Sequence, residues 1–157
     1  MKSRATPRRE PTPAEPPQPR VHGHPCRVIY GDTDQVGVAY YSNYLRWFEV
    51  GRNEYLRAVG YLYSRLEAEG VVLPVVEVGC RYLRPAFYDD LLRIESRIEE
   101  IRRVRVRFAY RIARAETDET LATGFTVHGS VDRQGVPSRL PESFLGALRD
   151  FERSQPR

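Results

Sequence analysis

Hydrophobic and polar positions recur at two different spacings along the chain. Between residues 42 and 60 the apolar side chains recur every three or four positions, which predicts an amphipathic helix. Ser42 or Asn43 can cap its start, and Gly60 stands where a helix commonly ends. Gly51 in its middle indicates a close approach to a neighbouring element. The apolar positions of this helix are Tyr44, Leu45, Phe48, Tyr55, Leu56 and Val59.

After a short helical stretch that ends at Glu69, the spacing changes to the alternation that is typical of strands. Four strands with one apolar and one charged face follow, and a short strand at residues 26–30 precedes the helix. The connections at residues 84–90, 101–103 and 116–120 are short or polar, so we expect an antiparallel meander of hairpins. The apolar positions of the four strands are Val76, Val78, Cys80 and Tyr82; Leu92, Ile94, Ser96 and Ile98; Val104, Val106, Phe108, Tyr110 and Ile112; and Leu121, Thr123, Phe125, Val127 and Val131.

A last amphipathic segment starts near Pro141 and turns Phe144, Leu148 and Phe151 inward. One long helix and about five strands therefore share one core, and the helix is the element available to cover the apolar face of the sheet. The predicted class is α+β.

The 157 residues suit one domain, which we place at residues 23–157 after a disordered tail rich in Pro and Arg at residues 1–22. The tail has no apolar centre, and its Glu10 and Glu15 disfavour a cleaved presequence. No apolar run approaches the roughly 18 residues of a membrane span. Cys26 and Cys80 lack CxxC spacing, which favours reduced core thiols in a cytoplasmic protein. Without a Cys/His cluster we expect no metal site.

The net charge of +4 and the pI near 9.3 are compatible with an anionic partner, such as nucleic acid, a membrane surface or a phosphorylated small molecule. Residues 102–111 are the strongest basic feature, and Arg105, Arg107 and Arg111 are expected on the solvated face of a strand. A nucleic-acid platform would need aromatic side chains on that same face. Phe108 and Tyr110 fall on the opposite face, so we expect no nucleic-acid partner.

The stretch "YGDTDQVGVAYYSNY" at residues 30–44 places Asp32 and Asp34 just before the predicted helix. The first turn of a helix offers unpaired N–H groups and the positive end of the dipole, which can stabilise an oxyanion. Gly37 lets the chain approach a ligand closely. These parts suit acyl transfer without a Ser/His/Asp triad, whereas the alternative is that both acids only form turns and caps.

Residues 28–56, "VIYGDTDQVGVAYYSNYLRWFEVGRNEYL", resemble the signature of the 4-hydroxybenzoyl-CoA thioesterase family, including its Tol–Pal-associated branch. The likeness continues through residues 73–103 and covers roughly residues 25–140. It implies a hotdog fold, in which a curved antiparallel sheet wraps one long helix, and acyl-CoA thioesterase activity. The matching positions are Asp32-Thr33-Asp34, Gly37-Val38, Tyr41, Asn43-Tyr44, and Glu49 with Arg52.

The resemblance also implies roles for individual residues. Asp34 matches the carboxylate that attacks the thioester or activates water, and Asp32 matches an acid outside the chemistry. Tyr41 matches the position whose backbone N–H polarises the thioester carbonyl, and Arg102 and Arg103 match a basic pair that holds the coenzyme A phosphates. No metal or redox cofactor is implied, since coenzyme A is part of the substrate. The Tol–Pal branch has histidine where this chain has Tyr41, which excludes a mechanism that needs that imidazole and leaves the acyl group open.

Other features have structural interpretations. Glu49 is expected in an exposed ion pair with Arg46 or Arg52, with a second pocket acid as the alternative. His128 is expected on the surface, and Trp47 in the core or at a subunit contact.

A free sheet edge favours a homodimer with the pocket at the interface, assembled further into a homotetramer. A module that binds acyl-CoA or acyl carrier protein without catalysis remains the alternative function.

Overall fold

The computed structural model describes residues 19–154, which form three α-helices, one 3-10 helix and five strands. Each predicted helix is present, whereas the first strand begins and ends earlier in the chain than predicted. The elements are β1 (His22–Arg27), η1 (Tyr30–Asp32), α1 (Asn43–Val59), α2 (Tyr63–Ala68), β2 (Val75–Tyr82), β3 (Leu91–Arg102), β4 (Arg105–Arg114), β5 (Thr120–Gly129) and α3 (Glu142–Arg153).

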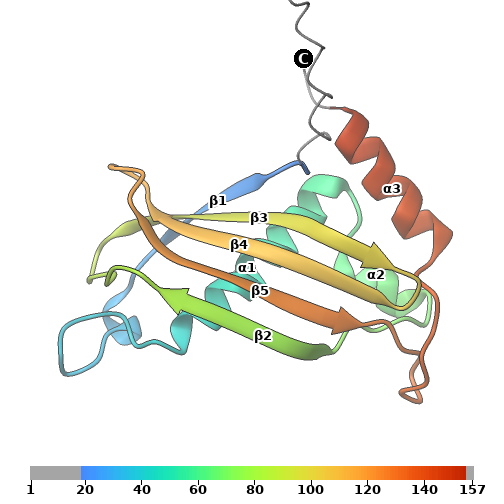
Figure 1. The fold of residues 1–157 in the computed structure, drawn as a ribbon, viewed down its shortest axis with the longest axis horizontal. Coiled ribbons are helices and arrows are strands. Elements are labelled where there is room, and N and C mark those ends of the chain that lie inside the picture. The colour runs from blue at the N-terminus through green and yellow to red at the C-terminus, as the bar shows by residue number, and fades with distance from the viewer. Residues whose placement is uncertain (1–18, 155–157) are drawn as a thin grey trace, which may run out of the picture.

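The five strands form one antiparallel sheet in the order β1-β3-β4-β5-β2, and the sheet curves around α1 (Figure 1). This arrangement confirms the predicted α+β hotdog architecture. α3 lies beyond the β1 and β3 side of the sheet, and α2 connects α1 to β2. Of the helices in residues 19–154, none is long and apolar enough to cross a membrane.

The apolar face of α1 packs against the concave face of the sheet. Trp47, Phe48 and Tyr55 are buried, and the Phe48 ring stacks on Tyr110 with 4.5 Å between centroids. Gly51 allows the close approach that the sequence predicts, because an added Cβ would lie 2.5 Å from the side chains of Ile94 and Ser96 on β3. The helix ends at Gly60, whose φ of 80° is the left-handed conformation that glycine adopts most readily.

The predicted hairpin between β2 and β3 is wrong. β2 pairs with β5 at one edge, and β3 pairs with β1 and β4 on the other side of the sheet. Residues 83–90 therefore cross from one side to the other. Within this connection Phe87 forms an isolated bridge with Val38, so the crossover braces the loop that carries the two candidate acids.

Leu121 and Val127 of β5 are buried as predicted, but beyond Leu121 the positions paired with the core-facing residues of β4 are one residue away from the predicted ones. Ile112 pairs with Ala122 but Ala113 pairs with Thr120, so Leu121 is an extra residue that shifts the alternation. Phe125, which we expected in the core, lies on the outer face with the Arg107 guanidinium 3.7 Å above its ring. The residues of β5 that face the core are Ala122, Gly124, Thr126 and His128, opposite Ile112, Tyr110, Phe108 and Val106 of β4.

The same shift buries His128, which the sequence placed on the surface and which is only 1% exposed. Its Nδ1–H donates to the Leu73 carbonyl at 2.9 Å, so Nε2 accepts from the Thr126 hydroxyl at 2.8 Å. Tyr110 donates in turn to Thr126 at 2.7 Å, and Arg52 of α1 lies 3.4 Å from the Tyr110 hydroxyl. A directed chain of hydrogen bonds thus holds a neutral imidazole inside the sheet.

The buried imidazole is expected to weaken the fold in acid. Burial is the main cause that lowers the pKa of His128 from 6.5 to about 4. Between these values the unfolded chain binds a proton that the folded chain does not, so the free energy of unfolding falls as the pH falls. The full effect is about 3 kcal/mol. Chemical denaturation at pH 7 and pH 4.5 should show this loss in the wild type and in His24→Asn, and a much smaller loss in His128→Asn. An equal loss in His128→Asn would contradict the assignment.

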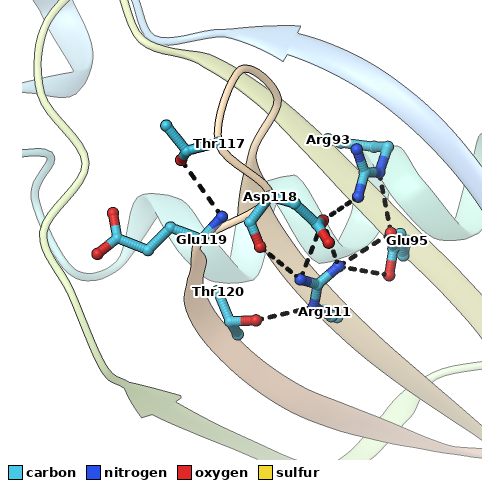
Figure 2. A network of polar contacts seen from close by, with 7 residues as sticks. All are labelled: Arg93, Glu95, Arg111, Thr117, Asp118, Glu119 and Thr120. Atoms are coloured by element: carbon cyan, nitrogen blue, oxygen red, sulfur yellow. Dashed lines mark hydrogen bonds and ion pairs between the residues drawn. The ribbon is translucent and has the colours of Figure 1, made fainter.

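Charged side chains on the outer face of the sheet are paired with one another. Arg111 of β4 lies 3.1 Å from Glu95 and 3.0 Å from Asp118, and its Nε donates to Thr120 at 2.8 Å (Figure 2). Arg93 also contacts Asp118, so the network joins β3 and β4 to the turn that leads into β5. These two arginines lower the pKa of the Asp118 carboxyl.

The boundary of the predicted tail needs correction. Residues 1–18 of that tail lie outside the described residues, but His22 begins β1 and Arg20 contacts α3. The Arg20 guanidinium donates to the Phe151 carbonyl at 2.9 Å and lies 3.9 Å above the Phe151 ring. The folded part of the chain therefore starts before residue 23.

Candidate active site

Asp32 is the structural anchor of the loop before α1, as its matched position implies. It is 3% exposed, its Oδ2 accepts from the Ile29 N–H at 3.0 Å, and its Oδ1 forms an ion pair with Arg46 of α1. Its backbone carbonyl accepts from the N–H of Tyr40 at 2.7 Å and from the Asn43 side chain at 2.8 Å. One residue thus ties the loop to the first turns of the helix.

Asp34 lies two residues further on, at the start of a tight turn. Its Oδ1 accepts from the Val36 N–H at 2.8 Å, which is an Asx turn, and its own N–H donates to the Val38 carbonyl at 3.0 Å. Gly37 has a φ of 85°, as this turn requires. The side chain is half-buried and has no cationic partner within residues 19–154. Within residues 19–154, the other carboxylate oxygen has no hydrogen-bond donor.

Tyr41 stands just before the first residue of α1 and packs against Tyr40. Its ring lies 4.6 Å from that of Tyr40, and the pKa of Tyr40 is raised by the neighbouring Tyr41 hydroxyl and, to a smaller extent, by the Asp34 charge. Within the described residues, the backbone N–H groups of Tyr41 and Ser42 have no hydrogen-bond acceptor. The first turn of α1 thus has two N–H groups without an acceptor in that part of the chain, and the loop that leads into it carries the Asp34 carboxylate.

A cleft of about 290 Å³ opens at this helix start. Asp34 does not line the cleft itself, but its N–H donates to the carbonyl of Val38, which does. The cleft is lined by Val38, Ala39, Tyr41, Tyr44, Tyr82, Leu83, Arg84 and Pro85. Tyr82 comes from the far edge strand β2, and the prediction of site residues missed it. The alternation of the strand already placed Tyr82 on the apolar face, at the strand's last position, and this is the signal that could have identified it.

Arg102 and Arg103 are not near this cleft in one protomer. They lie at the β3–β4 turn, whereas Tyr82 is paired with Ala122 at the opposite end of the sheet (Figure 1). Along β2, seven residues separate Tyr82 from the end nearest that turn, a length of about 23 Å. Arg102 is paired with Glu100 at 2.7 Å, whereas Arg103 is exposed and has no carboxylate partner in the described part of the chain.

Other candidate groups do not join the site. Glu49 is exposed, and the ion pair expected with Arg46 or Arg52 is wrong, because Arg46 pairs with Asp32 and Arg52 approaches Tyr110. Both cysteines are free and half-buried against the core. In residues 19–154 no three His, Cys, Asp or Glu side chains form a group that could hold a metal ion.

Comparison with known proteins gives consistent matches over the same region. Residues 28–148 match the thioesterase-like superfamily. The Bacillus subtilis protein YneP is 38% identical over 124 residues, covering 79% of this chain and 87% of YneP. The Escherichia coli acyl-CoA thioester hydrolase YbgC is 38% identical over 92 residues, covering 59% of this chain and 69% of YbgC. The crystal structure of DHNA-CoA thioesterase from Staphylococcus aureus superposes with a TM-score of 0.78 at 28% identity, covering 83% and 89% of the two chains.

Proposed function

The chain belongs to the thioesterase-like superfamily, and from this premise we propose that it hydrolyses acyl-CoA thioesters at the cleft beside Asp34. The observation that carries the proposal is the juxtaposition at the start of α1. The loop before α1 carries a carboxylate without a cationic partner in the described residues, near enough to Tyr40 to raise its pKa, and the next two N–H groups lack an acceptor there. A carbonyl bound between them would meet a nucleophile or base on one side and oxyanion donors on the other.

The proposed reaction uses only groups of this chain and water. The thioester oxygen would accept hydrogen bonds from the helix N-terminus, which stabilise the negative charge of the tetrahedral intermediate. Asp34 either attacks the carbonyl carbon, giving a mixed anhydride that water then hydrolyses, or removes a proton from a water that attacks directly. Both routes break the C–S bond, release coenzyme A as a thiol after it takes up a proton, and leave the free acid. No metal or redox cofactor takes part in either route.

We also propose that the working unit is a homodimer, which can assemble further into a tetramer. β2 is the edge strand next to β5, and its side chains are largely exposed, including Val75, Val76 and Val78. Antiparallel pairing of two β2 strands would cover these edges and continue the sheet into the second copy. We expect this homodimer to function in the cytoplasm.

Such a dimer would bring the basic pair to the site from the other subunit. Antiparallel pairing places the partner's β3–β4 turn at the same end of the joint sheet as the cleft, displaced sideways by about 15 Å, or three strand spacings. Arg102 and Arg103 could then hold the phosphates of a coenzyme A whose thioester lies at Asp34. Arg103 should contribute more, because Arg102 already shares its charge with Glu100.

The two alternatives are less well supported. A binding module without catalysis would have no use for a carboxylate that lacks a cationic partner. A nucleic-acid platform would need free arginines, but Arg107 and Arg111 on the outer face are paired with Glu99 and with Glu95.

A thiol-release assay tests the proposed function. We expect the chain to release free coenzyme A faster than spontaneous hydrolysis from at least one member of a panel of short aliphatic, long aliphatic and aromatic acyl-CoA thioesters. Binding of the same compounds without release from any of them would instead establish the binding module.

A further inference from the structure

Tyr82 makes a contact that links the edge strand to the helix start. It is the last residue of β2, and its hydroxyl donates a hydrogen bond to the backbone carbonyl of Tyr41 at 2.9 Å. The Tyr82 ring is held edge-on against two other rings, with 6.4 Å to the centroid of Tyr41 and 5.0 Å to that of Tyr44. The hydroxyl is therefore aimed by packing at one peptide group of the cleft.

That peptide group joins Tyr41 to Ser42. A peptide bond is planar and trans, so its carbonyl and its N–H point in opposite directions. Fixing the Tyr41 carbonyl therefore fixes the direction of the Ser42 N–H. The preceding peptide is fixed in a similar way, because the Asn43 N–H donates to the Tyr40 carbonyl at 3.0 Å and so orients the Tyr41 N–H. The Tyr41 carbonyl is otherwise weakly held, by the Tyr44 N–H at 3.4 Å.

We propose, on the premise of the function above, that Tyr82 is a positioning residue that aligns the Ser42 N–H as a second oxyanion donor beside the Tyr41 N–H. The Asn43 N–H bond to the Tyr40 carbonyl closes a turn around Tyr41 and Ser42, and Ser42 has the helical values φ −69° and ψ −21°, so both N–H groups belong to the unpaired first turn of the helix. Two parallel donors bind a developing oxyanion more strongly than one, provided that neither has to reorient during the reaction.

The Tyr82 hydroxyl is a donor in neutral buffers, although the residue is 45% exposed. Burial is the main cause that raises the pKa of Tyr82 to about 12, so the phenol stays protonated in neutral and moderately alkaline buffers. The side chain also lines the cleft together with Tyr41 and Tyr44. The hydrogen bond consequently forms part of the wall against which the acyl group would lie.

The test compares Tyr82→Phe, Ser42→Pro and the double variant with the wild-type chain. Tyr82→Phe keeps the ring and removes only the hydroxyl, whereas Ser42→Pro removes the N–H at a φ that proline can adopt. Because proline disfavours the helical conformation of the preceding Tyr41, an unchanged melting temperature is required of Ser42→Pro as well. We expect kcat to fall about tenfold in Tyr82→Phe and about 10²-fold in Ser42→Pro. The Kd of an S-alkyl coenzyme A, which has no carbonyl, should stay within twofold of wild type in both. Tyr88→Phe, an exposed tyrosine packed against Tyr30, is the matched control and should retain the wild-type kcat.

The double variant distinguishes positioning from a separate effect. If Tyr82 acts through the Ser42 N–H, the double variant should be no slower than Ser42→Pro alone. A double variant whose kcat falls by the product of the two single losses would overturn the proposal. A kcat of Tyr82→Phe within twofold of wild type would do the same, as would a loss of kcat explained by a lower melting temperature. Absence of turnover by the wild-type chain over the whole panel would overturn the proposed function, and this inference with it.

Discussion

Asp34→Asn should lower kcat for acyl-CoA hydrolysis by about 10²–10⁴-fold, the range typical of a lost general base, with little change in thermal stability. The asparagine oxygen can still accept the Val36 N–H bond that shapes the turn, but an amide is neither a nucleophile nor a base at neutral pH. Steady-state thiol release and thermal unfolding measure the two quantities. A kcat within tenfold of wild type would contradict the assignment of Asp34.

Asp32→Asn is the matched control for this prediction, because it makes the same chemical change two positions away. Here the charge holds Arg46 and the side chain is buried, so the expected loss is in stability, about 1–2 kcal/mol given that Arg46 is half exposed. The pair of variants separates the reacting acid from the structural one. Equal effects of the two substitutions on stability would contradict this division.

Local signals were enough to predict the elements that position the candidate site. The spacing of apolar residues, with Gly60 at the end, gave α1 nearly residue by residue, and the three alternating segments gave the β3–β4–β5 meander. Both depend on neighbours in the sequence, where periodicity is informative. Asp34 and Tyr41 lie within eight residues of each other on the chain, so the sequence also placed both of them in the segment that leads into α1.

The errors arise where the outcome depends on distant contacts. The alternation in β5 is ambiguous because apolar residues occupy both faces, and the extra residue Leu121 is visible only once β5 is paired with β4. His128 is buried because Leu73 and Thr126 satisfy both ring nitrogens, and neither partner is predictable from the strand pattern. The crossover at residues 83–90 looked like a hairpin because turn residues alone do not specify which strands pair.

The relation between the acid and the arginines is the least predictable part of the site. In the sequence, Arg102 and Arg103 simply follow the matched stretch, but within one protomer they lie at the opposite end of the sheet from Tyr82. A single substrate can contact Asp34 and Arg103 only if the coenzyme A spans the length of β2 or if the arginines come from a second copy. Antiparallel pairing of two β2 edges favours the second arrangement, which makes each site depend on both chains.

Mixed dimers should therefore recover a wild-type KM in only one of two pairings. A dimer of an Asp34→Asn chain with an Arg102→Ala/Arg103→Ala chain contains one site with an intact acid and intact arginines, if the arginines act across the interface. That site should show the wild-type KM. The homodimer of the Arg102→Ala/Arg103→Ala chain should instead show a KM raised about 10- to 100-fold, because both sites have lost the phosphate contacts. The control dimer pairs a chain carrying all three substitutions with a wild-type chain, and should show only the raised KM. Differently tagged chains, co-expressed and purified on both tags, allow the measurement. A wild-type KM in the control dimer instead of the first one would mean that the arginines serve the acid of their own chain.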